Sequence, residues 1–195
     1  MKQKYSQGEL RSSLGKLRKK LGRFNLSLRY DRDTKNAKEH KQINKVFKKF
    51  GNKNVIDIGC HIGYYSTLIS SFAESVVGID IRDKSIKQAN YFKEIMKVDN
   101  TEFKTKSAFD IDDNFMKNHN INAVFIHKSV GIEGTNTYWS DENFEQVFSL
   151  LAKHCDTVVC NRVERIKDIF VKKGFSVKES PSYRSNIFYL IEKEK

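Results

Sequence analysis

Asn54-Val-Ile-Asp-Ile-Gly-Cys-His-Ile-Gly-Tyr-Tyr-Ser-Thr-Leu-Ile-Ser70 is the segment from which the rest of the chain can be interpreted. Residues 55–58 are a short apolar run with Asp57 near its end, a pattern typical of a buried parallel strand. Gly59 and Gly63 indicate a turn, and residues 66–69 favour the start of a helix. Because open α/β sheets bind ligands at the carboxyl ends of their strands, this turn predicts a binding site.

Two properties of the turn limit what it can bind. Gly59 and Gly63 lack Cβ atoms, so the backbone can take positive φ angles and a ligand can approach it closely. Asp57, just before the turn, would repel phosphate and favours a cationic ligand that bears an amino group. The glycine patterns of dinucleotide-binding and P-loop proteins, which hold phosphate groups, are both absent from the turn.

The segment from Asp57 to Gly63 resembles the D-x-G-x-x-x-G turn of class I S-adenosylmethionine-dependent methyltransferases. The resemblance implies an α/β, Rossmann-like fold, with a seven-stranded, mostly parallel sheet, a C-terminal antiparallel hairpin and helices on both faces. It also implies that S-adenosyl-L-methionine is the cofactor. His61 departs from the family, in which Gly or Asn is common at this position. The cofactor-binding residues implied in the turn are Asp57, Gly59, Cys60, His61 and Gly63.

A second apolar segment, residues 76–81, has Asp80 and Ile81 at its end. In the family, the acid at the end of the second strand accepts hydrogen bonds from both ribose hydroxyls, a task for a fixed pair of acceptor oxygens. Rossmann dehydrogenases use an acid in the same way, so Asp80 alone indicates only an adenosine ribose. The resemblance, together with the first turn, assigns Asp80 and Ile81 to the cofactor site.

Two further parts of the cofactor site follow from the resemblance. The turn after the third expected strand would hold the adenine through Phe109 and Asp110, with the Asp110 carboxylate accepting from the exocyclic amine. Arg32 could reach the methionine carboxylate of the cofactor, although a surface ion pair with Asp31 or Asp33 is equally compatible with the sequence.

The other elements are expected from apolar periodicity and from residues that start or stop helices. The expected helices are residues 36–50, 84–97, 141–154 and 163–173, and the further strands are residues 101–106, 122–127, 157–160, 175–178 and 186–192. The last two strands have no helix between them, so they must pair antiparallel. The family strand order would then be 3-2-1-4-5-7-6, in a domain of residues 36–195 that follows a basic arm, residues 1–35.

The net charge of +12 arises entirely at the beginning of the chain. Residues 1–50 contain 16 Lys and Arg against 4 Asp and Glu, whereas residues 51–195 contain 20 of each kind. This asymmetry favours a polyanionic partner, nucleic acid or an anionic membrane surface, although a solvated arm without a specific partner is the alternative. Residues 1–29 also have the pattern of a basic amphipathic helix. RNA, bound through residues 1–50, is the partner that we expect first, because Lys and Arg bind phosphates without reading sequence.

Composition also bounds the compartment and the cysteine chemistry. The sequence has no apolar run as long as a membrane span and no signal-peptide pattern, so we expect a soluble cytoplasmic protein. Cys60, Cys155 and Cys160 are odd in number and show no C-x-x-C spacing, so we expect core thiols instead of disulfides or metal ligands.

Catalytic residues are hard to identify in this class, because the implied cofactor already carries an activated methyl group and the enzyme mainly aligns donor and acceptor. His127, Lys128 and Glu133 are candidates for steering or deprotonating the acceptor, and Tyr138 and Trp139 could stack against it. The Asn/Asp-Pro-Pro-Tyr/Phe box of N6-adenine methylases is absent, which disfavours that reaction. A small-molecule or protein acceptor is an alternative to RNA, and a NAD-dependent oxidoreductase or a non-catalytic Rossmann-like binding module are alternatives to a methyltransferase.

Overall fold

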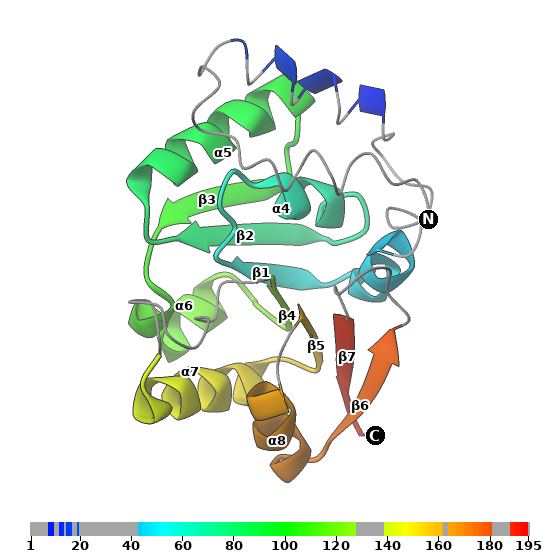
Figure 1. Cartoon of the computed structure of the whole chain (residues 1–195), viewed down its shortest axis with the longest axis vertical. Helices are drawn as coiled ribbons and strands as arrows, with labels where there is room; N and C mark the ends of the chain where they lie inside the picture. The colour runs from blue at the N-terminus through cyan, green and yellow to red at the C-terminus, as the bar shows by residue number, and fades with distance from the viewer. Residues whose placement is uncertain are drawn as a thin grey trace.

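One seven-stranded sheet forms the centre of the computed structural model, with strands in the order β3-β2-β1-β4-β5-β7-β6 (Figure 1). The structure describes residues 8–9, 12–13, 15–16, 19, 43–127, 139–161, 164–180 and 188–194. The pairs from β3 to β5 are parallel, whereas β7 is antiparallel to both β5 and β6. This topology confirms the fold class expected from the sequence. The strands are β1 (Asn54–Ile58), β2 (Ser75–Asp80), β3 (Thr101–Thr105), β4 (Ala123–Ile126), β5 (Thr157–Asn161), β6 (Phe175–Ser180) and β7 (Phe188–Lys193).

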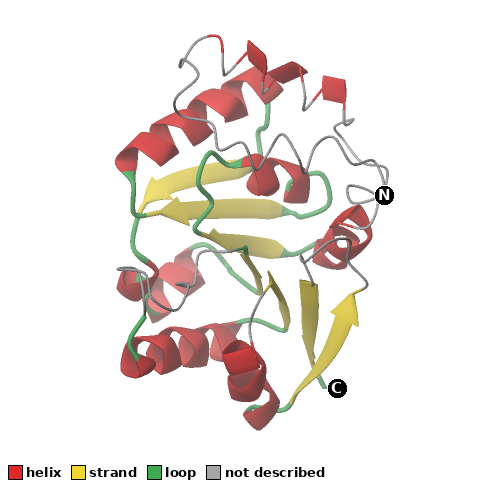
Figure 2. Cartoon of the chain, in the orientation of Figure 1, coloured by secondary structure: helices red, strands yellow, loops and turns green. Residues whose placement is uncertain are grey.

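Helices cover both faces of the sheet, and each face buries an apolar cluster of its own (Figures 1 and 2). One face carries helical residues 43–47, which continue into the 3-10 helix η1 (Lys48–Phe50), and also α4 (Tyr64–Ile69) and α5 (Asp83–Met96). The other face carries α6 (Asp113–Asn118), α7 (Asp141–His154) and α8 (Glu164–Lys172). A second 3-10 helix, η2 (Ala108–Asp110), lies between β3 and α6 in the chain.

Strand β1 contributes to both clusters, because successive side chains of a strand point to opposite faces. Val55 belongs to the cluster under α4, whereas Ile56 and Ile58 belong to the cluster under α7. All four residues from Val55 to Ile58 are buried, as expected for a central parallel strand covered on both faces. The same alternation places the Asp57 side chain on the α4 side of the sheet, where it is buried.

Aromatic rings hold the helix before β1 against the α4 side of the sheet. The ring centroid of Phe47 lies 6.1 Å from that of Phe50 and 5.1 Å from that of Phe125. Tyr65 of α4 lies 5.5 Å from the same Phe125 ring. Such pairs stabilise a core beyond the apolar area that they bury. The part of the expected helix before residue 43 lies outside the described residues.

Two helix starts illustrate what local sequence predicted and what it did not. Helix α7 spans residues 141–154 as expected, and the Ser140 hydroxyl caps it by accepting from the Asn143 amide at 3.3 Å. Helix α6 and η2 were not expected from the sequence. Asp112 starts α6 in the same way, accepting from the Phe115 amide at 2.7 Å.

Strand β2 ends one residue earlier than expected. Ile81 was expected inside the strand, but β2 ends at Asp80 because the chain turns there, with the Asp80 carboxylate accepting from the Arg82 amide at 2.9 Å. Of the expected amphipathic helix in residues 1–29, the seven described residues are helical and the others lie outside the described part.

Cys60, Cys155 and Cys160 are free thiols and are buried in the core, the location expected from the sequence. Among the described residues, no group of His, Cys, Asp and Glu side chains could hold a metal ion. The described part of the chain contains no helix of the length and apolarity needed to cross a membrane.

Asn100 connects the end of α4 with the start of β3. Its Nδ2 lies 3.0 Å from the carbonyl oxygen of Ser70 and 3.2 Å from those of Ala73 and Glu74. Asn100→Ala is expected to lower the free energy of unfolding by about 1–2 kcal/mol, because these carbonyls lose their donor. Denaturant unfolding followed by circular dichroism measures this change. The exposed Asn114→Ala in α6 is the control, and equal losses in the two variants would contradict the prediction.

Candidate functional site

The turn between β1 and α4 has a backbone that few residue types adopt. Gly59, His61 and Gly63 have φ angles of 74°, 52° and 72°. The amides of Gly59 and Cys60 both donate to the carbonyl oxygen of Ile79 in β2, at 2.8 and 2.9 Å. The turn is therefore fixed to the carboxyl end of the neighbouring strand, with its backbone in a left-handed conformation at three of five positions.

Close packing against Phe103 of β3 determines how near the turn lies to the sheet. A Cβ atom on Gly63 would lie 2.4 Å from the Phe103 ring, and one on Gly78 would lie 2.6 Å from it. Phe103 also packs with Cys60, which is 4% exposed. Burial raises the pKa of the Cys60 thiol well above its usual range, so Cys60 borders the site through its backbone and a protonated side chain.

Asp80, at the end of β2, joins the two turns at this edge of the sheet. Its Oδ2 accepts from the His61 amide at 3.0 Å, and its Oδ1 accepts from the Arg82 amide at 2.9 Å and from Arg82 Nε at 3.3 Å. Asp80 is buried, with 6% of the residue exposed. A carboxylate oxygen can accept two hydrogen bonds, so Oδ2 retains acceptor capacity beyond its bond to His61. The Arg82 side chain is exposed and can leave Oδ1.

Asp57 lies beneath the glycine turn and is 1% exposed. The Ser66 hydroxyl donates to its Oδ2 at 2.5 Å, and Ser66 is itself fully buried. Burial raises the pKa of the Asp57 carboxyl to about 7; the hydrogen bond from Ser66 opposes this rise, and the charge of Asp80 adds to it. A negative charge at Asp57 is therefore costly unless a cation lies nearby.

His61 takes the place where Gly or Asn was expected from the resemblance, and its positive φ explains that preference. Only Gly, and to a lesser extent Asn, Asp and His, adopt this conformation readily. Burial and the charge of Arg82 lower the pKa of His61, against the opposing charge of Asp80. The His61 imidazole is therefore neutral near pH 7. The residue contributes to the site through its backbone amide, which donates to the Asp80 carboxylate.

Apolar side chains are exposed at the same edge of the sheet. Ile81, directly after β2, is 67% exposed, and Phe109, in η2 after β3, is 41% exposed. The Phe109 ring lies 4.7 Å from that of Trp139, at an interplanar angle of 63°. Asp110 follows in η2 and is exposed. The apolar side chains of Ile81, Phe109 and Trp139, with the Asp110 carboxylate next to Phe109 in the chain, suit a flat, partly polar base.

His127 lies at this edge too, because it follows Ile126 of β4, which pairs with Ile58 of β1. Its ring is half-buried and lies 4.7 Å from the Tyr65 ring of α4 and 6.3 Å from the parallel Phe125 ring. Aromatic neighbours on two elements therefore orient the imidazole. The other candidates, Arg32, Lys128, Glu133 and Tyr138, lie outside the described residues.

The structure brings nine of the expected cofactor residues to the carboxyl ends of β1, β2 and β3. Sequence reasoning missed three residues that shape the site: Ser66, Arg82 and Phe103. No sequence signal distinguished Ser66 from the neighbouring Thr67 hydroxyl in α4, because which of them reaches β1 depends on how the helix packs. Phe103 could not be found without the register that places it opposite Gly78.

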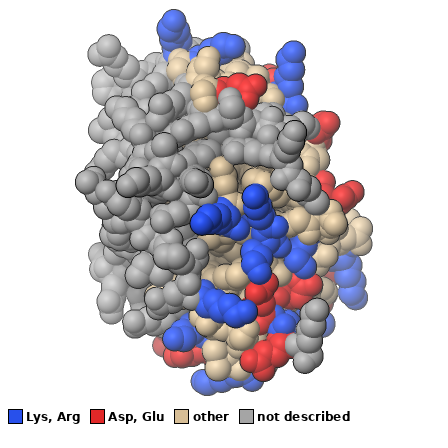
Figure 3. Space-filling view, turned by 90° about the vertical axis from the view of Figure 1, so that its right-hand side faces the viewer, with Lys and Arg blue, Asp and Glu red and all other residues tan. Residues whose placement is uncertain are grey.

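A basic surface, which we define as Lys45, Lys48, Lys49, Lys53 and Lys178, lies elsewhere on the molecule. Lys45, Lys48, Lys49 and Lys178 are exposed, and Lys53 is half-buried. Figure 3 looks at this side of the molecule and shows basic side chains gathered there, with acidic ones beside them.

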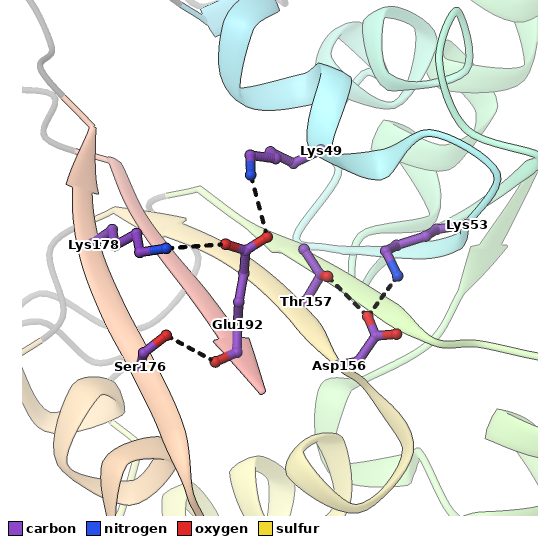
Figure 4. A network of polar contacts seen from close by, with 7 residues as sticks. All are labelled: Lys49, Lys53, Asp156, Thr157, Ser176, Lys178 and Glu192. Atoms are coloured by element: carbon purple, nitrogen blue, oxygen red, sulfur yellow. Dashed lines mark hydrogen bonds and ion pairs between the residues drawn. The ribbon is translucent and has the colours of Figure 1, made fainter. Parts of the chain in front are cut away.

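Acidic side chains of β7 and of the loop before β5 pair with part of the basic surface (Figure 4). Glu192 lies 3.4 Å from Lys49 Nζ and 3.9 Å from Lys178 Nζ, and Asp156 lies 2.7 Å from Lys53 Nζ. Glu192 is opposite the first residue of β5, so these pairs lie at the amino ends of the parallel strands. The three paired lysines of the basic surface, Lys49, Lys53 and Lys178, and the glycine turn are thus at opposite ends of the sheet.

The antiparallel hairpin of β6 and β7 at the end of a parallel sheet, with a glycine turn after β1, is the arrangement of the class I methyltransferase fold. A family model described as a methyltransferase domain matches residues 49–192. The match spans most of the chain, which therefore belongs to this methyltransferase family. No curated protein matches the sequence.

Several solved structures are similar to this chain. The DhpI–SAH complex has a TM-score of 0.61 at 14% identity and covers 98% of this chain and 100% of its own. Magnesium protoporphyrin IX methyltransferase from Synechocystis PCC 6803, with bound SAM, has a TM-score of 0.58 at 17% identity. The match covers 93% of this chain and 92% of that protein. An rRNA methylase from Streptococcus thermophilus has a TM-score of 0.57 at 10% identity, and the match covers 80% of this chain and 97% of the methylase. At these identities the similarity establishes the fold.

Proposed function

We propose that the chain transfers a methyl group from S-adenosylmethionine to RNA. The single observation that carries the proposal is the arrangement of Asp57 and Asp80 around the turn of residues 59–63. Asp80 has an acceptor oxygen available for a ribose, and the buried Asp57 carboxylate beneath the turn would be stabilised by a bound cation. Ile81 and Phe109 offer apolar surface for the base. These groups fit an adenosine with a cationic amino-acid tail and do not fit a phosphate.

The cofactor, when bound, supplies a methyl group that is already activated by a positive sulfonium. The chain's own residues therefore have to bind, orient and exclude water. His127 lies at the same edge of the sheet and is the described residue that we propose for accepting a proton from the methyl acceptor. Lys128 and Glu133 follow it in sequence and are proposed to share the steering or deprotonation of the acceptor.

RNA is the proposed acceptor because the positive charge of the chain is concentrated in residues 1–50. Three residues of the basic surface, Lys45, Lys48 and Lys49, continue this charge onto the folded domain. Lys49 lies at the far end of the sheet from the glycine turn, and a strand of five residues such as β1 spans roughly 17 Å. An acceptor that contacts both ends must be an extended chain or a folded RNA.

A small-molecule or protein acceptor is the alternative, and the ion pairs favour it in one respect. Glu192 and Asp156 already neutralise part of the charge of Lys49, Lys53 and Lys178. A phosphate backbone would have to compete with these acids. A non-catalytic binding module is a second alternative, and it would bind neither S-adenosylmethionine nor S-adenosylhomocysteine.

Transfer of labelled methyl groups from S-adenosylmethionine to total RNA tests the proposal. The double variant Lys45→Ala/Lys48→Ala is expected to raise KM for RNA about tenfold at low salt, because phosphate contacts are lost. Its salt dependence of binding should also be weaker, with a slope reduced by about two.

The matched control is Lys167→Ala/Lys172→Ala, which removes two exposed lysines from α8 on the other face of the sheet. Equal losses in the two double variants would show that only the overall charge matters. Labelling of protein or small molecules, with none of RNA, would refute the RNA part and leave the methyltransferase part standing.

A further inference from the structure

Asp57 and Ser66 form a buried polar pair beneath the glycine turn. The Ser66 hydroxyl donates to Asp57 Oδ2 at 2.5 Å. Ser66 is 0% exposed and Asp57 is 1% exposed. In the strand register, Asp57 lies between Gly78 of β2 and Phe125 of β4, neither of which carries charge. Among the described residues, the side chain that hydrogen-bonds this carboxylate is that of Ser66, whose backbone amide also donates to it.

The electrostatic surroundings of the pair are mostly acidic or neutral. The Asp80 carboxylate of β2 acts on Asp57 by charge, and Arg82 is engaged with Asp80. Helix α4 and strand β4 contain no charged side chain. The other titratable groups on elements packed around the pair are Cys60 and His61 in the turn, Tyr64 and Tyr65 in α4, and His127 after β4.

We infer that Ser66 is a positioning residue for the cofactor: its hydroxyl favours the ionised form of Asp57, so that cationic cofactor and proton compete for the charge beneath the turn. The inference rests on the proposed use of S-adenosylmethionine. A buried carboxylate attracts an ammonium or sulfonium strongly, because little solvent screens the interaction. By linkage, a cation that prefers ionised Asp57 must lower the carboxyl's affinity for protons.

The sign of the pH dependence follows from this competition. Burial raises the pKa of Asp57 to about 7 in the free chain, and a bound cation lowers it. Affinity for S-adenosylmethionine should therefore rise with pH, by up to about tenfold per pH unit below pH 7, and level off above it. Removing the Ser66 hydroxyl removes a group that favours ionisation, so the same rise should move to higher pH.

Calorimetric titration of S-adenosylmethionine into the full chain, between about pH 6 and pH 9, tests the inference without any activity assay. In buffers of different ionisation enthalpy, binding to the unaltered chain should release nearly one proton at about pH 6 and none well above pH 8. Ser66→Ala should weaken binding about three- to tenfold at pH 7 and approach normal affinity at about pH 9. Ser66→Thr, which keeps the hydroxyl, should restore the profile.

Ser70→Ala is the matched control, because Ser70 is also a buried serine of this segment and donates to the Thr67 carbonyl at 2.8 Å. It should leave the pH profile in place. Carbon NMR titration of the Asp57 carboxyl in the free chain gives a second reading, in which Ser66→Ala should shift the midpoint upward.

Three outcomes would overturn the inference: binding without proton release, equal weakening by Ser66→Ala at every pH, or the same shift in Ser70→Ala. Failure of the unaltered chain to bind S-adenosylmethionine at any pH would instead overturn the proposed function, and the inference with it.

Discussion

Gly78→Ala is expected to destabilise the folded chain by about 3 kcal/mol or more. A Cβ atom at this position would lie 2.6 and 2.7 Å from two atoms of the Phe103 ring and 3.1 Å from Cys60 Cβ. Gly78 lies in β2 between β1 and β3, so its backbone cannot move away without loss of hydrogen bonds on both sides. The Phe103 ring is buried and would have to leave its position.

Urea unfolding of the variant, followed by circular dichroism, measures this loss. Phe103→Leu in the same chain should recover part of it, because the smaller side chain makes room, and a double-mutant cycle would give a favourable coupling of about 1–2 kcal/mol. Gly15→Ala, where nothing lies within 4 Å of the new Cβ, serves as the control. Additive effects of Gly78→Ala and Phe103→Leu would contradict the proposed clash.

Asp80→Ala is expected to weaken binding of S-adenosylhomocysteine at least about 100-fold, or roughly 3 kcal/mol. The change removes the acceptor oxygens proposed for the ribose and also leaves the His61 and Arg82 amides without their partner. Losing the charged acceptor and losing the turn that it holds in place both weaken binding of S-adenosylhomocysteine. Calorimetry at pH 8, with thermal unfolding of the same samples, separates lost binding from lost folding.

Asp83→Ala provides the comparison for this variant, because Asp83 is an exposed acid of α5 that pairs with Lys87 at 2.6 Å. It changes the net charge equally and should leave the affinity within about twofold. Asp80→Asn, which keeps one acceptor oxygen, should fall between the two. Full affinity in Asp80→Ala would remove the ribose role and, with it, the main support for the proposed cofactor geometry.

Local patterns predicted the parts of the molecule that depend on local chemistry. The run of residues 55–58, the turn glycines and the cap at Ser140 each carry their own signal, so β1, the turn and α7 were expected within a residue or two. Helix α6 was missed because a six-residue helix offers too few turns for an apolar period to show. Its start signal, Asp112, was visible only as one of several acids.

Contacts between distant residues could not be predicted in this way. The pairing of Phe103 with Gly63 and Gly78 depends on strand register and on the depth of the turn. The hydrogen bond from Ser66 to Asp57 depends on how α4 lies over β1. The position of the basic surface at the amino ends of the strands is likewise a property of the whole sheet, whereas the charge itself was evident from composition.

The strand order β5-β7-β6 has a consequence for how the chain is made. The last strand in the sequence, Phe188–Lys193, lies inside the sheet, between two strands that are synthesised before it. Until these residues have left the ribosome, β5 has an open edge and β6 has no neighbour to pair with. The five parallel strands can pair early, but β6 can join the sheet only after residues 188–193 have left the ribosome. Nascent chains stalled before residue 188 should therefore expose an unpaired strand edge of the kind that recruits chaperones or aggregates.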